Sequence, residues 1–213
     1  MFRNRTDAAE QLARALHAYR GQHPLVLAIP RGAVPMGQLL AQRLGGELDV
    51  VLVRKLGAPG QPELAVGAMD ESGWSYVAPY AAQLGADAAY LQAEKRRQLQ
   101  TLRARRARYT PIRAPIDPAG RTVNVVDDGL ATGATMVAAL HSVRNHHPAR
   151  LICAVPVASP EALEQVRPMV DEVVCLLAPI DFGAVGQYFD DFDQVEDDTV
   201  EALLRQPAKA KPR

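Results

Sequence analysis

The sequence predicts an α/β fold built on a doubly wound, mostly parallel and twisted sheet with helices on both faces. Three observations support this prediction: 48% of the residues are hydrophobic, short apolar runs of strand length recur along the chain, and helical stretches separate them. Continuous apolar runs are typical of parallel strands buried on both faces, and strands that alternate with helices form such sheets. A length of 213 residues fits one domain, which we expect to span residues 1–205 with small hairpin or hood additions.

The first part of the chain predicts a helix, a strand, a tight loop and a second helix. Residues 7–20 place their apolar side chains on one helical face, and residues 25–29 form a short apolar run. After the loop Pro30-Arg31-Gly32-Ala33, Pro35 can open a helix that the glycines at 45–46 end.

The next segment predicts a strand, an irregular loop and a hairpin. Residues 48–53 repeat the buried-strand pattern, whereas residues 54–62 contain too much glycine and proline for regular structure and predict a mobile loop. Residues 65–70 and 74–78 flank Glu71-Ser72-Gly73, which is typical of a hairpin.

The rest of the chain continues the alternation of strands and helices. A strongly basic helix is expected over residues 87–108, and Asp198 with Glu201 indicates a capping box on a last short helix. The tail 206–213 has nothing apolar to bury, so we expect it to be disordered. The other expected elements are strands at 121–126, 150–155 and 172–177 and helices at 133–145 and 160–166.

Bulk composition excludes several classes of protein. Lys+Arg and Asp+Glu both number 24, so no net charge indicates a nucleic acid or a membrane as partner. No apolar run approaches the length that spans a bilayer, and residues 1–20 lack the core of a signal peptide, so we expect a cytoplasmic protein. Cys153 and Cys175 stand in separate apolar runs, which disfavours a disulfide or a zinc site.

Charge is unevenly distributed along the chain. Eight basic residues lie between Lys95 and Arg113, whereas residues 168–201 contain many carboxylates and no lysine or arginine. The two segments could attract each other within one chain or across a dimer, and we expect a homo-oligomer. The basic run could also contact a nucleic-acid backbone, but it lacks interleaved aromatic residues, so we expect a solvated helix face and no nucleic-acid partner.

Residues 123–135 carry the most specific chemical signal. An apolar strand ends in two adjacent carboxylates, Asp127 and Asp128, and a loop of small residues leads into a helix. Ligands of open parallel sheets bind beyond the carboxyl ends of strands, and ionised carboxylates accept hydrogen bonds from the vicinal hydroxyls of a sugar. The acid pair therefore predicts a ribose site, although two acids at a strand end can also form a solvated turn or a helix cap.

The loop after the acid pair is suited to a phosphate group. Its small residues leave the backbone amides uncovered, its threonines add hydroxyl donors, and the following helix directs its positive end toward the loop. We therefore expect the loop to bind one phosphate monoester. The expected contacts are Gly129, Ala131, Thr132, Gly133, Ala134 and Thr135.

In this segment a hydrophobic strand, Asp-Asp, Gly and Thr-Gly-x-Thr appear in register, and the segment resembles the signature of type I phosphoribosyltransferases. The resemblance implies an enzyme that moves the 5-phosphoribosyl group from 5-phosphoribosyl-1-pyrophosphate (PRPP) to a nitrogen base and releases pyrophosphate. It also implies that Asp127 and Asp128 act as catalytic residues by positioning the ribose. Mg²⁺ is the implied cofactor, held mainly by substrate oxygens and water rather than by protein ligands.

The resemblance extends over most of the chain and implies two sets of pyrophosphate contacts. Arg31, Gly32 and Ala33 match the family's loop after an early strand, which often contains a cis peptide, here implied near Arg31-Gly32. Arg54 and Lys55 follow the next predicted strand at the same sheet edge and resemble the second set. The alternative for these charged residues is solvated surface charge.

A flexible lid and a nucleobase pocket are also implied by the resemblance. Residues 57–63 match the lid loosely, and Glu63 is the one carboxylate there and a candidate for proton transfer. The alternative is that this segment is a long connection. Phe182 and Tyr188 lie in an aromatic and glycine run after the last strand, where their rings could bind a base or pack the domain edge.

Ala131 bears on the identity of the acceptor. In family members that use 6-oxopurines, an aspartate at this position exchanges a proton with the base, which alanine cannot do. We therefore expect hypoxanthine and guanine to be poor acceptors, and adenine, a pyrimidine or an unusual nitrogen base to be better. Two rival functions stay open: a non-catalytic protein that senses PRPP or a nucleotide, and a hydrolase or phosphorylase acting on phosphorylated nucleosides.

Overall fold

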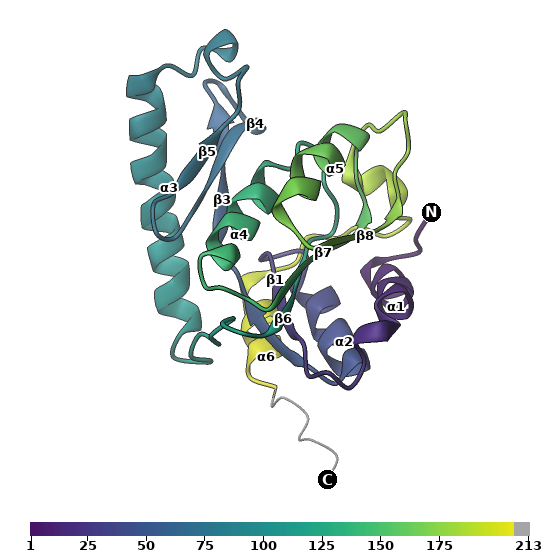
Figure 1. Ribbon diagram of the computed structural model, residues 1–213. Helices are drawn as coiled ribbons and strands as arrows, with labels where there is room; N and C mark the ends of the chain where they lie inside the picture. The colour runs from purple at the N-terminus through teal and green to yellow at the C-terminus, as the bar shows by residue number, and fades with distance from the viewer. Residues whose placement is uncertain (207–213) are drawn as a thin grey trace.

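The computed structural model describes residues 1–206 and confirms the predicted α/β fold, with a five-stranded parallel sheet between two layers of helices (Figure 1). The strands lie in the order β2-β1-β6-β7-β8. The chain therefore progresses in opposite directions from the β1 and β6 pair, and open sheets of this kind bind ligands at such a switch point. The strands are β1 (Leu25–Ala28), β2 (Glu47–Val50), β6 (Thr122–Val126), β7 (Arg150–Val157) and β8 (Glu172–Leu177).

Both faces of the sheet are buried, which explains why the strands are apolar without alternation. On β6, Val123 and Val125 pack into one hydrophobic core, and Val126 packs into the other. Two helices lie over each face. They are α1 (Arg5–Ala15) and α2 (Val34–Leu44) on one side and α4 (Ala134–Arg144) and α5 (Pro160–Val166) on the other.

A three-stranded antiparallel sheet supplies the predicted hairpin addition and lies between α4 and the long helix α3 (Figure 1). Asp87 accepts a hydrogen bond from the Tyr90 amide and so caps the start of α3. These elements are β3 (Val53–Ala58), β4 (Gln61–Asp70), β5 (Ser75–Val77) and α3 (Ala88–Tyr109).

The prediction of a mobile loop over residues 54–62 is wrong. β3 and β4 pair through this range and leave only a tight turn at Pro59-Gly60, where Gly60 has a φ of 71°. Gly57 sits at an irregularity in the pairing, and a Cβ on it would lie 2.6 Å from the Pro62 carbonyl oxygen. The glycines that indicated irregular chain therefore permit a bulge and a turn in a hairpin.

The predicted strand 48–53 is also divided between two sheets. β2 ends at Val50, and Val53 begins β3, which pairs with β4 instead of β1. The apolar run does not show where the chain leaves one sheet for the other, because β2 and β3 are both largely buried.

The last helix, α6 (Asp197–Leu204), starts one residue before the predicted capping residue. Glu196 is its N-cap and its side chain makes no capping hydrogen bond, so the capping-box prediction is wrong. Glu201 pairs instead with Arg108 and Arg205. The structure also contains short 3₁₀ helices at His17–Tyr19, Ala82–Leu84, Arg167–Met169 and Val185–Tyr188. Of the predicted disordered tail, residues 207–213 lie outside the described part of the chain.

The basic and acidic segments attract each other within this one chain. Arg108 of α3 pairs with Asp197, Asp198 and Glu201 of α6, and Arg105 of α3 also approaches Asp197. Much of the charge on the arginine-rich helix is therefore balanced by internal carboxylates. None of the helices within residues 1–206 combines the length and apolar character that a membrane crossing requires.

Candidate functional site

Two loops meet at the switch point of the parallel sheet. One follows β1 and contains Arg31 and Gly32, and the other follows β6 and contains Asp127 and Asp128. They approach so closely that a Cβ on Gly32 would lie 2.2 Å from Asp128 Oδ2. Glycine is required here by this close approach, and the fold thus brings together the predicted ribose and pyrophosphate contacts.

The loop after β6 has the features that anion binding needs. Gly133 caps α4 with a φ of 74°, a left-handed conformation that favours glycine. Leu130 bridges to Ala158 at the end of β7, and the Ser159 hydroxyl donates to the Ala131 carbonyl at 2.7 Å. Within residues 1–206, no hydrogen bond uses the amide of Ala131, Thr132 or Gly133. The loop is therefore fixed by its contacts with residues 158 and 159, while these three amides stay available as donors.

Arg5 is a charged neighbour of the acid pair that the sequence analysis missed. It donates to Asp128 Oδ2 from Nε at 3.1 Å and from Nη2 at 2.9 Å. Its Nη1 donates to the Asp193 carbonyl at 2.6 Å, and its guanidinium lies 3.9 Å from the centre of the Phe192 ring. No local pattern marks this arginine, because it stands 123 residues before its partner.

The two carboxylates are in different electrostatic situations. Burial raises the pKa of Asp127 well above its ordinary value, and the neighbouring charge of Asp128 raises it further. Burial also raises the pKa of Asp128, but the Arg5 guanidinium opposes this effect. Asp127 accepts a hydrogen bond from the Asp128 amide at 2.9 Å. Ionised Asp127 is therefore costly to the folded protein, which is typical of functional carboxylates.

This cost predicts that Asp127→Asn stabilises the protein. A carboxyl whose pKa is raised on folding destabilises the folded state above that raised pKa, and the penalty disappears below the unfolded value, near 3.8. At pH 7 we expect a higher melting temperature, by about 2–4 °C for each kcal/mol added to the free energy of unfolding. The difference should shrink as the pH falls, which thermal unfolding across a pH series measures. A lower melting temperature at pH 7 would contradict this account.

Arg31 is partly exposed and contacts the C-terminal part of the chain. Its Nη1 lies 3.3 Å from Glu196 Oε2 and 3.6 Å from Asp197 Oδ2, with 27% of the side chain exposed. The cis peptide of this loop joins Pro30 to Arg31, one bond before the implied position. Ala33 is buried at the start of α2, directly after Gly32.

Arg54 and Lys55 occupy the start of β3 and point to opposite faces of it, because side chains alternate along a strand. The Arg54 Nε donates to Gln98 Oε1 at 2.9 Å. Burial lowers the pKa of Arg54, and the nearby charges of Arg105 and Arg31 lower it further. Arg54 thus lies within electrostatic range of Arg31 and Arg105, and its role as a pyrophosphate contact stays a prediction.

Lys55 and Glu63 form a pair of their own on the β3–β4 hairpin. The Lys55 ammonium donates to the Glu63 carboxylate and to its main-chain oxygen, and 91% of the Glu63 side chain is exposed. This partner lowers the pKa of Glu63, which weakens it as a proton acceptor. The structure thus places neither residue against the acid pair.

The aromatic run after β8 lies beside the phosphate-suited loop. The rings of Phe182 and Tyr188 stack with centroids 5.5 Å apart, and a Cβ on Gly129 would lie 2.6 Å from Val185 Cγ1. A hollow of about 400 Å³ adjoins both segments. Its lining is Tyr80, Ala131, Thr132, Ser159, Glu161, Gln165, Phe182 and Gly183. Phe182 therefore lines this hollow, whereas Tyr188 is not among its lining residues and stacks on Phe182.

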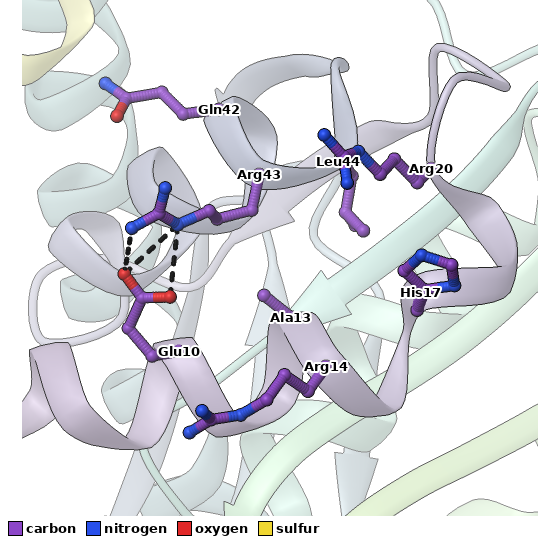
Figure 2. A pocket seen from close by; sticks show the side chains of 8 residues that line it. All are labelled: Glu10, Ala13, Arg14, His17, Arg20, Gln42, Arg43 and Leu44. Atoms are coloured by element: carbon purple, nitrogen blue, oxygen red, sulfur yellow. Dashed lines mark hydrogen bonds and ion pairs between the residues drawn. The ribbon is translucent and has the colours of Figure 1, made fainter.

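Another hollow, of about 270 Å³, lies between α1 and α2 and contains none of the predicted site residues (Figure 2). It is lined by the last turns of both helices, and α2 runs from the carboxyl end of β1 to the amino end of β2. Arg43 pairs with Glu10 there, and Arg14 adds charge at the carboxyl end of α1, a favourable place for cations. This hollow is therefore at the opposite edge of the sheet.

Fold and site define a doubly wound α/β protein with an acid pair and an anion-suited loop at its switch point. The sequence profile of the phosphoribosyl transferase domain matches residues 2–192, and the chain belongs to that family. The protein TT1426 from Thermus thermophilus is similar in structure, with 50% identity, a TM-score of 0.79, and coverage of 96% of this chain and 97% of that protein.

The curated relatives are longer than this chain. Proteins of two Mycobacterium tuberculosis strains, CDC 1551 / Oshkosh and H37Rv, are provisionally named phosphoribosyl transferases and are 42% identical over 205 residues. The match covers 96% of this chain and 46% of each relative, so the chain spans about half the length of the curated relatives it matches.

Proposed function

We propose that this chain transfers the 5-phosphoribosyl group of PRPP to a nitrogen base and releases pyrophosphate, with Mg²⁺ as cofactor. The observation that carries this proposal is the contact between the two loops, since Asp128 Oδ2 abuts Gly32 next to Arg31. A ribose held by the acid pair would direct its 5′-phosphate into the loop at 129–135. Its pyrophosphate would then lie toward Arg31, because the ribose, the 5′-phosphate and the pyrophosphate belong to one molecule.

The reaction breaks the bond between the anomeric carbon and a pyrophosphate oxygen and forms a bond from that carbon to a base nitrogen. Positive charge develops on the ribose ring and negative charge on the leaving group. The partly buried carboxylates of Asp127 and Asp128 suit the first charge, and the guanidiniums of Arg31 and Arg54 suit the second. The protein's task is to position the reactants and to stabilise these charges.

The residues present fit a hard divalent cation bound through the substrate. Adjacent carboxylates supply oxygen ligands or hydrogen-bond acceptors for its water shell, and Mg²⁺ characteristically keeps several waters and substrate phosphate oxygens. Asp127 and Asp128 would be the residues that hold the water shell of such an ion. When bound, the ion would neutralise charge on the leaving pyrophosphate.

The hollow beside Ala131 is the proposed base pocket. Phe182 and Tyr80 offer rings to a flat base, and Gln165 offers an amide, with its Nε2 already donating to the Tyr76 hydroxyl at 2.8 Å. Ala131 presents a methyl group, so this position of the loop supplies no carboxylate for proton exchange with a 6-oxopurine, although Glu161 lines the same hollow. We therefore propose that adenine, a pyrimidine or an unusual nitrogen base is preferred to hypoxanthine and guanine.

The test is an assay of pyrophosphate release from PRPP and Mg²⁺ with a panel of bases. The preferred base should exceed hypoxanthine and guanine in rate by on the order of a hundredfold, which is the typical contribution of a positioned proton-transfer group. Reactions with a chelator and reactions without a base are the controls. Release should stop in both.

Each outcome of the panel bears on a different part of the proposal. Efficient turnover of hypoxanthine or guanine would contradict the inference from Ala131 but would support transfer itself. If none of the bases in a complete panel supports pyrophosphate release, the transferase function is contradicted. A melting temperature that rises with PRPP and Mg²⁺ in the same protein would then indicate a sensor of the same ligand.

A further inference from the structure

Asp197, the first residue of α6, is a meeting point for cations from separate elements. Arg31 Nη1 lies 3.6 Å from its Oδ2, and Arg105 Nε lies 3.8 Å from its Oδ1. Arg108 Nη1 lies 3.7 Å from Oδ2, and the Tyr109 hydroxyl donates to Oδ1 at 2.9 Å. One carboxylate thus faces three guanidiniums and a phenol.

One of these guanidiniums, Arg31, is a proposed pyrophosphate contact, and a second, Arg105, shares its carboxylate. Arg31 is in the loop after β1, and Arg105 reaches the same carboxylate from α3 with only 15% of its side chain exposed. Both are close enough to Arg54 for their charges to lower its pKa. Arg31 and Arg105 therefore share one acid, Asp197, although they belong to different elements.

We propose that Asp197 and the pyrophosphate group of the substrate compete for Arg31 and Arg105. Arg105 is then a further binding residue of the site, and Asp197 sets the affinity of the site for pyrophosphate. This inference rests on the proposed function, because it takes Arg31 to be a pyrophosphate contact.

The chemistry favours an exchange of one anion for the other. A carboxylate offers two oxygens and one charge, whereas pyrophosphate offers more oxygens and more charge to planar guanidiniums. The contacts from Asp197 to Arg31 and Arg105 exceed 3.5 Å, so they are ion pairs without close hydrogen bonds. Such contacts are weak enough for a phosphoryl group to replace.

The first test measures pyrophosphate binding to Asp197→Asn by titration calorimetry in the presence of Mg²⁺. Glu196 also pairs with Arg31, but Asp197 is the carboxylate that Arg31 and Arg105 share, so removing its charge should tighten binding by about threefold to tenfold, given that partly exposed ion pairs are individually weak. Asparagine keeps an oxygen that can accept from the Tyr109 hydroxyl. Asp198→Asn is the matched control, because Asp198 pairs with Arg108 and is 93% exposed. It should leave the affinity unchanged.

The second test removes the proposed ligand with Arg105→Gln. Pyrophosphate affinity should fall by about tenfold or more, the usual effect of losing a charge-assisted hydrogen bond. Arg103→Gln on the exposed side of the same helix is its matched control and should bind as the wild type does.

The outcomes separate this inference from the proposed function. Absence of pyrophosphate binding to the wild type would overturn both. The competition alone would be overturned if the wild type binds pyrophosphate and Asp197→Asn binds it with the same affinity. The same holds if Asp198→Asn changes the affinity as much as Asp197→Asn does. Thermal unfolding reports whether each variant is folded. If Asp197→Asn does not fold, the test rests on the arginine variants. Equal pyrophosphate affinities of Arg105→Gln and Arg103→Gln would then overturn the inference.

Discussion

The double substitution Asp127→Asn with Asp128→Asn is expected to lower kcat/KM by about a hundredfold to a thousandfold, comparable to the loss of a preorganised electrostatic contact in other active sites. The amides keep the shape of the side chains but lose the charge that suits the developing ribose cation. They also place N–H donors where sugar hydroxyls need acceptors. Pyrophosphate release with the preferred base measures the loss.

The protein itself should stay folded, because the raised pKa of Asp127 shows that its ionised form is unfavourable in the folded state. A second adjacent acid pair, Asp190 and Asp191, provides the matched control. Both residues are exposed, they follow the buried Phe189, and neither side chain has a hydrogen bond or ion pair within residues 1–206. Full activity in the Asp127 and Asp128 double variant would show that the acid pair has been assigned wrongly.

The second large effect is expected for Arg5→Met. Asp128 would lose both hydrogen bonds to its Oδ2, at 3.1 and 2.9 Å, and the charge that opposes the rise of its pKa. We expect kcat/KM near pH 7 to fall by about tenfold to a hundredfold, since hydrogen bonds to charged groups contribute about 1.5–3 kcal/mol each. Arg5→Lys should recover part of this loss, because it retains the charge without the fork.

A pH profile distinguishes an electrostatic role of Arg5 from a merely structural one. Arg5 lowers the pKa of Asp128, so its removal should move the acid limb of the kcat/KM profile to higher pH. Arg3→Met is the control, because Arg3 is 82% exposed and pairs only with Asp7 within the described residues. An unshifted acid limb in Arg5→Met would contradict the electrostatic role, whatever happens to the rate.

Elements whose structure depends on residues close together in the sequence were predicted well. The strand, acid pair, small-residue loop and helix around residues 122–144 form one continuous unit, and the structure reproduces them within a residue or two. The same holds for β8 and α5, whose predicted bounds match those observed. The spacing of hydrophobic residues and the glycines and capping residues at helix ends are local signals. They can therefore be recognised in the sequence.

Errors arose where the structure of a segment depends on its pairing with another strand. The glycine and proline of residues 54–62 indicated irregular chain, but pairing with β4 makes most of this range a strand. Lys55 and Glu63, predicted for separate roles, lie together across that hairpin. Neighbouring strands stabilise such pairs through hydrogen bonds that local composition does not reveal.

The sequence by itself determined the fold class, the family resemblance and the loop at 127–135, because each depends on residues close together in the chain. Only the tertiary structure decided which charges surround that loop. Arg5 reaches Asp128 from 123 residues away, and Arg31 meets Asp197 at the start of α6. The strength of such ion pairs depends on separation in space and on burial, neither of which follows from position along the chain.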